Sequence, residues 1–403
     1  MSNTTPTHDR QSHPCLARLL RRAGITLLMG FLSLVLSSFA LLTAPLEATE
    51  HEEMHRQILA GQEAMYQGQF EQALQQFTAL TQAHPDDPRG HFFLALTYRW
   101  LTRIDPSSKT YQRHFERTIK QAIRVAEALL EDTTRQAEAL LYLAAAYGYR
   151  GEYYNFLKHS WSKAYDDGVK MQKYLKKAEK LSDDLIDMQL GFGLYNYYAY
   201  RYRDKIGWWR FLLSLPKGDR EKGIRLLETV RQQGVYARVE AWYFLIEIYK
   251  DEKESIAKAI ALCEDLHQTY PNQPFFHTLL AGIYHKGHKW QQSVSTARDI
   301  LAQAPANPYY SDYLIYQAHY LIGEGLFFLG QYDQALEKFD AIIASNPQDP
   351  EYLLPWSHLR RGTIYNLTGH PDAAKAEYNL VLEMQDVQNV HELAKGLLKN
   401  HKK

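Results

Sequence analysis

The first polar segment of the chain carries a spacing that is typical of zinc hydrolases. In His51-Glu52-Glu53-Met54-His55, a helix would place both imidazoles on one face, with a glutamate beside them to polarise a metal-bound water. No buried apolar helix encloses this segment, and no second short motif supplies a third ligand. The sequence therefore favours a solvated first helical turn, and we predict no catalytic residue, no metal and no cofactor. A zinc-dependent hydrolase using this segment is the alternative hypothesis from a different functional class.

A second candidate site is the concentration of aromatic side chains. The chain has 29 tyrosines, and they crowd its middle. Tyrosine and tryptophan supply large, rigid, amphipathic contact area, which is typical of binding surfaces, although roughly half of such residues should serve as core. Residues at helical spacing share one face, and that face is predicted to bind a protein or peptide. The predicted residues are Phe92, Arg99, Trp100, Tyr149, Phe192, Tyr195, Asn196, Tyr243, Phe275, Tyr320, Phe327 and Phe328.

Because aromatic platforms also stack on sugar rings, a carbohydrate-binding module is a further alternative.

A third candidate is the apolar insert at residues 206–216, which contains Trp208, Trp209, Phe211 and Leu212. Basic residues beside these aromatic groups would suit a partner-binding or membrane-interface element. The sequence favours a different interpretation, in which the insert folds over the core, because apolar inserts are more often buried than functional.

Short paired helices must position these candidates, because the sequence repeats itself at fixed spacing. In each copy, a small residue in the first helix lets the second helix approach, and a glycine between the helices adopts positive φ without strain. A small residue on the second helix is followed one turn later by an aromatic residue on the same face, and a proline ends the unit. The two best copies carry Gly61, Gly68, Ala73, Phe77 and Pro85, and Gly323, Gly330, Ala335, Phe339 and Pro347.

This pattern resembles the tetratricopeptide repeat (TPR), whose period is about 34 residues. The resemblance implies an all-α fold, a TPR-like α-solenoid in which antiparallel helix pairs form a right-handed superhelix. We expect regular repeats at about 54–100 and 239–385, an irregular middle with longer second helices at about 101–238, and a capping helix at about 386–400. The middle segment is also similar to eukaryotic TPR proteins of the TTC39/IML2 type. The resemblance is specific for fold and leaves the partner open.

Charge and cysteine content exclude some function classes. Lys plus Arg and Asp plus Glu both number 46, so the chain has no global field that would attract nucleic acid, and we predict no nucleic-acid partner. Cys15 precedes the apolar run of the N-terminus and so cannot be a lipobox cysteine. Cys263 is the only cysteine after that run, which leaves no intramolecular disulfide in the exported part. We expect Cys263 to be a small core residue.

The N-terminus has the order of an export signal. Residues 1–22 are basic, and residues 23–48 form an apolar run that ends in small residues. Cleavage after Ala40, Ala44 or Ala48 would release the chain, whereas an uncleaved run is long enough to anchor it, with membrane contact through residues 23–45. The basic residues stay cytoplasmic, so residues after about 48 are predicted to be periplasmic or anchored facing the periplasm.

Taken together, these patterns predict a non-catalytic protein–protein interaction scaffold of the cell envelope. Its TPR-like solenoid, residues 49–403, would bind a peptide or protein on the aromatic concave face. The irregular middle is where we expect a specific task to be carried out, with the regular repeats as its frame.

Overall fold

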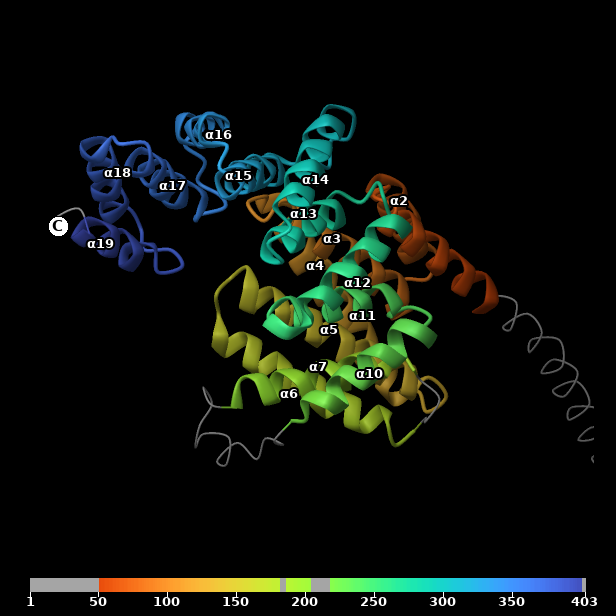
Figure 1. Ribbon diagram of the computed structural model, residues 1–403. Helices are drawn as coiled ribbons and strands as arrows, with labels where there is room; N and C mark the ends of the chain where they lie inside the picture. Colours follow the sequence, from red (N-terminus) through yellow and green to blue (C-terminus); the bar gives the residue numbers. More distant parts are fainter. Residues whose placement is uncertain (1–50, 182–185, 204–217, 401–403) are drawn as a thin grey trace, which may run out of the picture. The chain divides into compact units, whose positions relative to one another are not determined.

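A computed structural model describes residues 51–181, 186–203 and 218–400 (Figure 1). The chain divides into two compact units, residues 1–57 and residues 58–403, and each is considered by itself. Every regular element among the described residues is helical. The predicted export segment and the apolar insert with Trp208, Trp209, Phe211 and Leu212 lie outside the described residues.

In the first unit, residues 51–57 are helical, with His51 and Glu52 exposed. Within the described part of the chain, no group of three or more His, Cys, Asp or Glu side chains is placed to hold a metal ion. In the same part of the chain, no helix combines the length and the apolar character needed to cross a membrane.

The second unit is a succession of helix pairs. It begins with the helical residues 58–66, and its described part contains three short 3-10 turns, at Leu129–Glu131, Lys253–Ser255 and Ala304–Ala306. The α-helices are α2 (Phe70–Ala83), α3 (Pro88–Ile104), α4 (Lys109–Ala128), α5 (Gln136–Phe156), α6 (Trp161–Ala178), α7 (Met188–Arg201), α10 (Arg220–Gln233), α11 (Arg238–Lys250), α12 (Ile256–Thr269), α13 (Pro274–Lys286), α14 (Trp290–Gln303), α15 (Asp312–Phe328), α16 (Tyr332–Ser345), α17 (Leu353–Leu367), α18 (Pro371–Glu383) and α19 (Val390–Asn400).

The contacts within the two best repeats are those that the spacing predicts. A Cβ added to Gly61 would lie 2.6 Å from Cζ of Phe77, and one added to Gly323 would lie 2.9 Å from Cε1 of Phe339. The small residue of the first helix therefore makes room for the aromatic ring of the second, and both rings are fully buried. Gly330, which ends the first helix of its pair, has a φ of 74°, a conformation that favours glycine.

Some helices of the middle are longer than α2, which has 14 residues. The second helices α4 and α6 have 20 and 18 residues, whereas α10, also a second helix of this stretch, has 14. However, α5 has 21 residues and is the first helix of its pair. The extra length is therefore not confined to second helices. At the other end of the unit, α19 packs on the last helix pair through Val390 and Ala394.

The first repeats also pack against helices far along the chain. Helix α3 contacts its near neighbour α5 and, from much further along the chain, α13 (Figure 1). The Gln62 side chain donates a hydrogen bond to the carbonyl of Tyr236 (2.8 Å), and the Phe70 and Tyr309 rings lie 4.9 Å apart. In a simple solenoid each repeat contacts only its neighbours. These contacts therefore close the chain on itself and fill the space that a linear stack would leave open.

Candidate functional site

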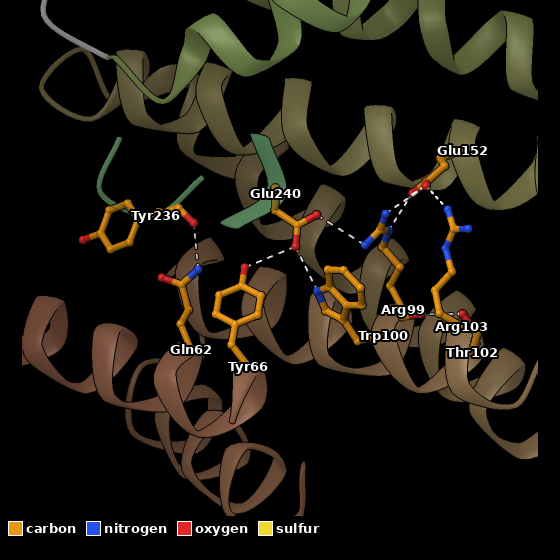
Figure 2. Close-up of polar contacts among 9 residues, drawn as sticks. All are labelled: Gln62, Tyr66, Arg99, Trp100, Thr102, Arg103, Glu152, Tyr236 and Glu240. Atoms are coloured by element: carbon orange, nitrogen blue, oxygen red, sulfur yellow. Dashed lines mark hydrogen bonds and ion pairs between the residues drawn. The ribbon is translucent and has the colours of Figure 1, made fainter. Parts of the chain in front are cut away.

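A buried network of charged side chains occupies the place where α3, α5 and α11 meet (Figure 2). Arg99 of α3 donates to both carboxylate oxygens of Glu152, at 2.6 and 2.8 Å, and reaches Glu240 at 3.3 Å on its other side. Arg103 donates to Glu152 as well. Glu240 also accepts hydrogen bonds from the Trp100 indole (2.8 Å) and the Tyr66 hydroxyl (3.2 Å). Every charge of the network thus has a partner.

The two carboxylates of this network differ in acidity. Burial alone would raise the pKa of Glu152, but the charges of Arg99 and Arg103 and the hydrogen bonds that they donate lower it to about 2. Burial raises the pKa of Glu240, and the negative charge of Glu152 adds to the effect, although Arg99 opposes both. Glu152 therefore stabilises the fold as a carboxylate, whereas ionisation of Glu240 is disfavoured.

Trp100 lies at the centre of an aromatic cluster and not on an accessible face. Its ring is fully buried and meets Tyr243, Phe275 and Phe276 at centroid distances of 5.5, 5.6 and 5.2 Å. The expectation that these residues form an open partner-binding surface is corrected for Arg99, Trp100 and Tyr243, because distant helices pack over them. The cause is the contact of the first repeats with α11 and α13, which no local spacing predicts.

The other predicted residues fall into three groups. Phe92, Tyr149 and Tyr320 are also buried, so the same correction applies to them. Phe192, Tyr195, Asn196 and Phe275 are partly buried, and the Asn196 side chain donates to the carbonyl of Phe192 at 2.9 Å. Phe327 and Phe328 remain accessible, with 44% of Phe328 exposed.

Phe328 belongs to an aromatic patch on α15, α17 and the first residue of α14. Its ring stacks on Trp290 at a centroid distance of 4.2 Å and an interplanar angle of 11°. The Arg360 guanidinium lies 5.2 Å from the Phe328 ring, 4.9 Å from Phe327 and 5.7 Å from Trp356. Glu324 accepts from this guanidinium and so fixes its orientation. We call Trp290, Phe327, Phe328, Trp356 and Arg360 the aromatic patch. Sequence reasoning missed Trp290, Trp356 and Arg360.

A second accessible feature is a groove of about 580 Å³ between α5, α6 and α7, which we call the apolar groove. Of the predicted residues, Tyr149 and Tyr195 line it. Trp161, Tyr165 and Val169 form its α6 wall at helical spacing and are exposed. That spacing is visible in the sequence and could have revealed an apolar helix face. Apart from Phe244 of α11, the residues that line the groove lie between 141 and 202, within the irregular middle.

Glycine contacts explain why the apolar groove stays open. A Cβ on Gly193 of α7 would lie 2.8 Å from Cγ of Leu227, and one on Gly223 of α10 would lie 2.8 Å from the carbonyl oxygen of Gly193. Helix α7 is thereby held closely against α10. On the other side, a Cβ on Gly151 of α5 would lie 3.3 Å from the Ala164 carbonyl oxygen of α6. Helices α5 and α6 pack tightly on each other, and so do α7 and α10, so the groove lies between these two helix pairs.

Two segments of the chain match a known family of helical-pair repeats. Two family models, each described as a tetratricopeptide repeat, match residues 58–99 and 317–349. Among solved structures, a human IFIT1 dimer with PPP-AAAA is 16% identical over 79% of this chain and 69% of that chain, with a TM-score of 0.44. The APC/C hetero-tetramer Cut9-Hcn1 is 12% identical over 84% and 53%, with a TM-score of 0.48. Yeast Tom70 is 11% identical over 84% and 86%, with a TM-score of 0.30. No curated protein matches the sequence.

The repeat contacts and the family models together show that the chain contains tetratricopeptide repeats, at residues 58–99 and 317–349. Such repeats support, in general terms, a protein–protein interaction scaffold.

Proposed function

We propose that the protein is an envelope scaffold that binds a protein partner through the aromatic patch. The observation that carries this proposal is the stack of the partly buried Trp290 on the exposed Phe328, with the Arg360 guanidinium beside it. Tryptophan and arginine are the residue types that dominate binding energy at protein interfaces, and aromatic residues are enriched there. Apart from Trp290, which begins α14, the patch lies on α15 and α17, first helices that contact one another. Phe328 is the one predicted partner-binding residue that is exposed in the described part of the chain.

The patch favours a protein partner over a catalytic role. Arg360 is neutralised by Glu324, which is itself buried and also contacts His285 at 3.4 Å. The patch therefore offers planar apolar contact and one oriented cation instead of an activated nucleophile or base. A flat site of this kind suits an extended or helical segment that presents apolar side chains and an acceptor for the remaining guanidinium N–H groups.

The first test compares capture of partners by two variants. We expect Phe328→Ala to reduce partners recovered from an envelope fraction by at least about tenfold, because truncation of a central aromatic anchor removes about 2 kcal/mol or more. Trp161→Ala is the matched control, since Trp161 is exposed but lies in the apolar groove. Quantitative mass spectrometry of material bound to each immobilised full-length chain measures the effect. Equal partner recovery by Phe328→Ala and the unaltered chain would contradict the proposal.

The proposed envelope location is tested separately. The basic segment and apolar run of residues 1–48 support export. We expect the chain in the periplasmic fraction with a new N-terminus after Ala40, Ala44 or Ala48, or in the membrane fraction uncleaved. N-terminal sequencing of the fractionated protein distinguishes these two outcomes. Recovery of the chain from the cytoplasm with its first residues intact would refute export while leaving the aromatic patch proposal open.

A further inference from the structure

The solvent-facing side of α4 carries a row of basic side chains. Lysine or arginine recurs every three or four residues along the helix, so five cations share one face over about 22 Å. All five are exposed, and within the described part of the chain none of them forms an ion pair. They are Lys109, Arg113, Arg117, Lys120 and Arg124. This row of positive charge is therefore open to a partner from outside.

The two acidic residues of α4 do not neutralise the row, because both interact with the neighbouring repeat. Glu116 accepts a hydrogen bond from the Tyr153 hydroxyl (2.5 Å) and forms an ion pair with Lys158 (3.2 Å). Glu127 accepts a hydrogen bond from the Tyr147 hydroxyl at 3.2 Å. The negative charge of α4 thus lies towards α5, and the excess of positive charge remains at the surface.

Lysines of α6 extend this surface across α5. Tyr147 of α5 links the two second helices, because its hydroxyl donates to α4 and its ring lies 5.0 Å from the Lys170 ammonium. The Lys163 ammonium lies 5.2 Å from the ring of Tyr154, which also belongs to α5. Both lysines are exposed and lie outside the apolar groove. We call Lys109, Arg113, Arg117, Lys120 and Arg124 of α4 and Lys163 and Lys170 of α6 the basic face.

The basic charge is concentrated on these helices, although the chain is neutral overall. Helices α4 and α6 each carry five basic and two acidic residues, a net charge of +3. In the C-terminal repeats, the second helices α16 and α18 each carry one basic and three acidic residues, a net charge of −2. An excess on neighbouring helices creates a local field that the total composition conceals. The basic face is therefore a property of the irregular middle and not of second helices in general.

The arrangement of the basic face favours a lipid bilayer over a strand of nucleic acid. Its cations lie on two helices on either side of α5, so the positive charge is spread in two dimensions, as are the headgroups of a bilayer. Sites for single-stranded nucleic acid instead combine a basic groove with aromatic rings on which bases stack. Here the Tyr147 ring is buried and the Tyr154 ring is half-buried, each beside a lysine. Neither ring is open to a base.

The connection between α5 and α6 gives a second indication. Phe156 and Trp161 are 51% and 62% exposed there, more than any other aromatic side chain in the described part of the chain. Lys158 and Lys163 each follow one of them by two residues, so large apolar groups and cations lie together at this connection. Aromatic residues are enriched where proteins meet the membrane–water interface, and adjacent basic residues favour anionic lipids.

We propose that the basic face docks on the surface of an anionic phospholipid bilayer, with its cations against the phosphate-bearing headgroups. The α5–α6 connection then lies at the lipid–water interface. Attraction of this kind is reversible and is weakened by salt. The basic face and the aromatic patch lie on different helices, so membrane docking adds to the proposed protein partner and does not depend on it.

Lysine acetylation of the full-length chain, mapped by mass spectrometry, tests the proposal at single residues. The vesicles contain phosphatidylcholine alone or with about 30% phosphatidylglycerol. In about 0.1 M salt, we expect the anionic vesicles to slow acetylation of Lys120, Lys163 and Lys170 at least about fivefold relative to neutral vesicles. Acetylation of Lys395, which is exposed on α19, should be unchanged. Because the readout is local, attachment of the chain through residues 23–45 is not counted as docking.

Two double variants with the same loss of charge provide the control. Arg113→Gln/Arg117→Gln removes two cations of the basic face, so acetylation of Lys120 with anionic vesicles should return to within about twofold of its rate with neutral vesicles. Arg298→Gln/Lys375→Gln removes two cations from exposed positions of the C-terminal repeats and should leave Lys120 protected. All four substituted side chains are exposed, so both variants should keep the helical circular dichroism of the unaltered chain.

Three results would overturn the proposal. They are equal acetylation rates with neutral and anionic vesicles, equal protection of Lys120 in the two double variants, and protection that persists in about 1 M salt, where charges are screened within about 3 Å. A soluble polyanion is the rival occupant. If polyglutamate or a single-stranded oligonucleotide protected Lys120, Lys163 and Lys170 and the anionic vesicles did not, the basic face would bind that polymer and not a membrane.

Discussion

Replacing Trp100 by alanine should lower the free energy of unfolding by about 3–5 kcal/mol, the range for loss of a buried tryptophan. The indole is fully buried and packs on Tyr243, Phe275 and Phe276, so truncation leaves a cavity between helices that are distant in sequence. It also removes a hydrogen-bond donor from the buried Glu240 carboxylate, which adds about 1–3 kcal/mol. The midpoint of urea unfolding, followed by circular dichroism at 222 nm, measures the change.

Trp161→Ala is the control for this substitution. It removes the same side chain from a position that is 62% exposed, so we expect a change of about 1 kcal/mol or less. If both variants unfolded at the same urea concentration, Trp100 would not join the first repeats to α11 and α13. Hydrogen exchange gives a second check. If Trp100→Ala lowered amide protection in the N-terminal helices alone, Trp100 would likewise not join the first repeats to α11 and α13.

The second large effect concerns the buried ion pair. We expect Glu152→Gln to lower the free energy of unfolding at pH 7 by about 3–5 kcal/mol, because it leaves Arg99 and Arg103 without their shared carboxylate in a buried site. The pKa of Glu152 is about 2 in the folded chain against an ordinary value of 4.5. Its contribution is therefore fully present above about pH 4.5 and is lost as pH falls towards 2. The difference between variant and unaltered chain should narrow over that range.

Glu240→Gln provides the contrast. The pKa of Glu240 is raised, chiefly by burial, so a neutral isostere replaces a group whose charge is already disfavoured. An amide oxygen can still accept from the Trp100 indole, and Arg99 keeps Glu152. We expect Glu240→Gln to lower the free energy of unfolding less than Glu152→Gln does. Its difference in unfolding free energy from the unaltered chain should not narrow as pH falls from 4.5 to 2. If that difference were equal at pH 7 and pH 2.5 for Glu152→Gln, Glu152 would not be an ionised partner of the arginines.

Local spacing was sufficient to predict the repeat architecture. The pairings of Gly61 with Phe77 and of Gly323 with Phe339 involve residues 16 apart, so a motif of about one repeat contains both partners. The burial of Cys263 followed from the same local reasoning. In each case the residue packs within its own helix pair or against the adjacent helix pair.

The candidate site could not be predicted in this way, because burial there depends on contacts between non-adjacent repeats. Trp100 and Phe328 are both aromatic residues of first helices, so the local sequence does not distinguish them. Trp100 is fully buried because α11 and α13 cover it, whereas Phe328 is 44% exposed although Trp290 stacks on it. The apolar groove likewise depends on two glycine contacts, Gly193 with α10 and Gly151 with α6, that close neighbouring pairs separately. The sequence shows these glycines but not which helix each approaches.

The contact of the first repeats with α11–α13 has a consequence for the order in which the chain acquires its structure. Phe70 meets Tyr309 and Gln67 meets the carbonyl of Thr269, so more than 200 residues separate the members of each pair. Contacts of such sequence separation slow folding, because a long loop must close before they form. During synthesis the aromatic face of α3 therefore stays uncovered until α13 has emerged. We infer that the nascent chain passes through a stage that is prone to aggregation, and that it acquires its native packing late and cooperatively instead of repeat by repeat.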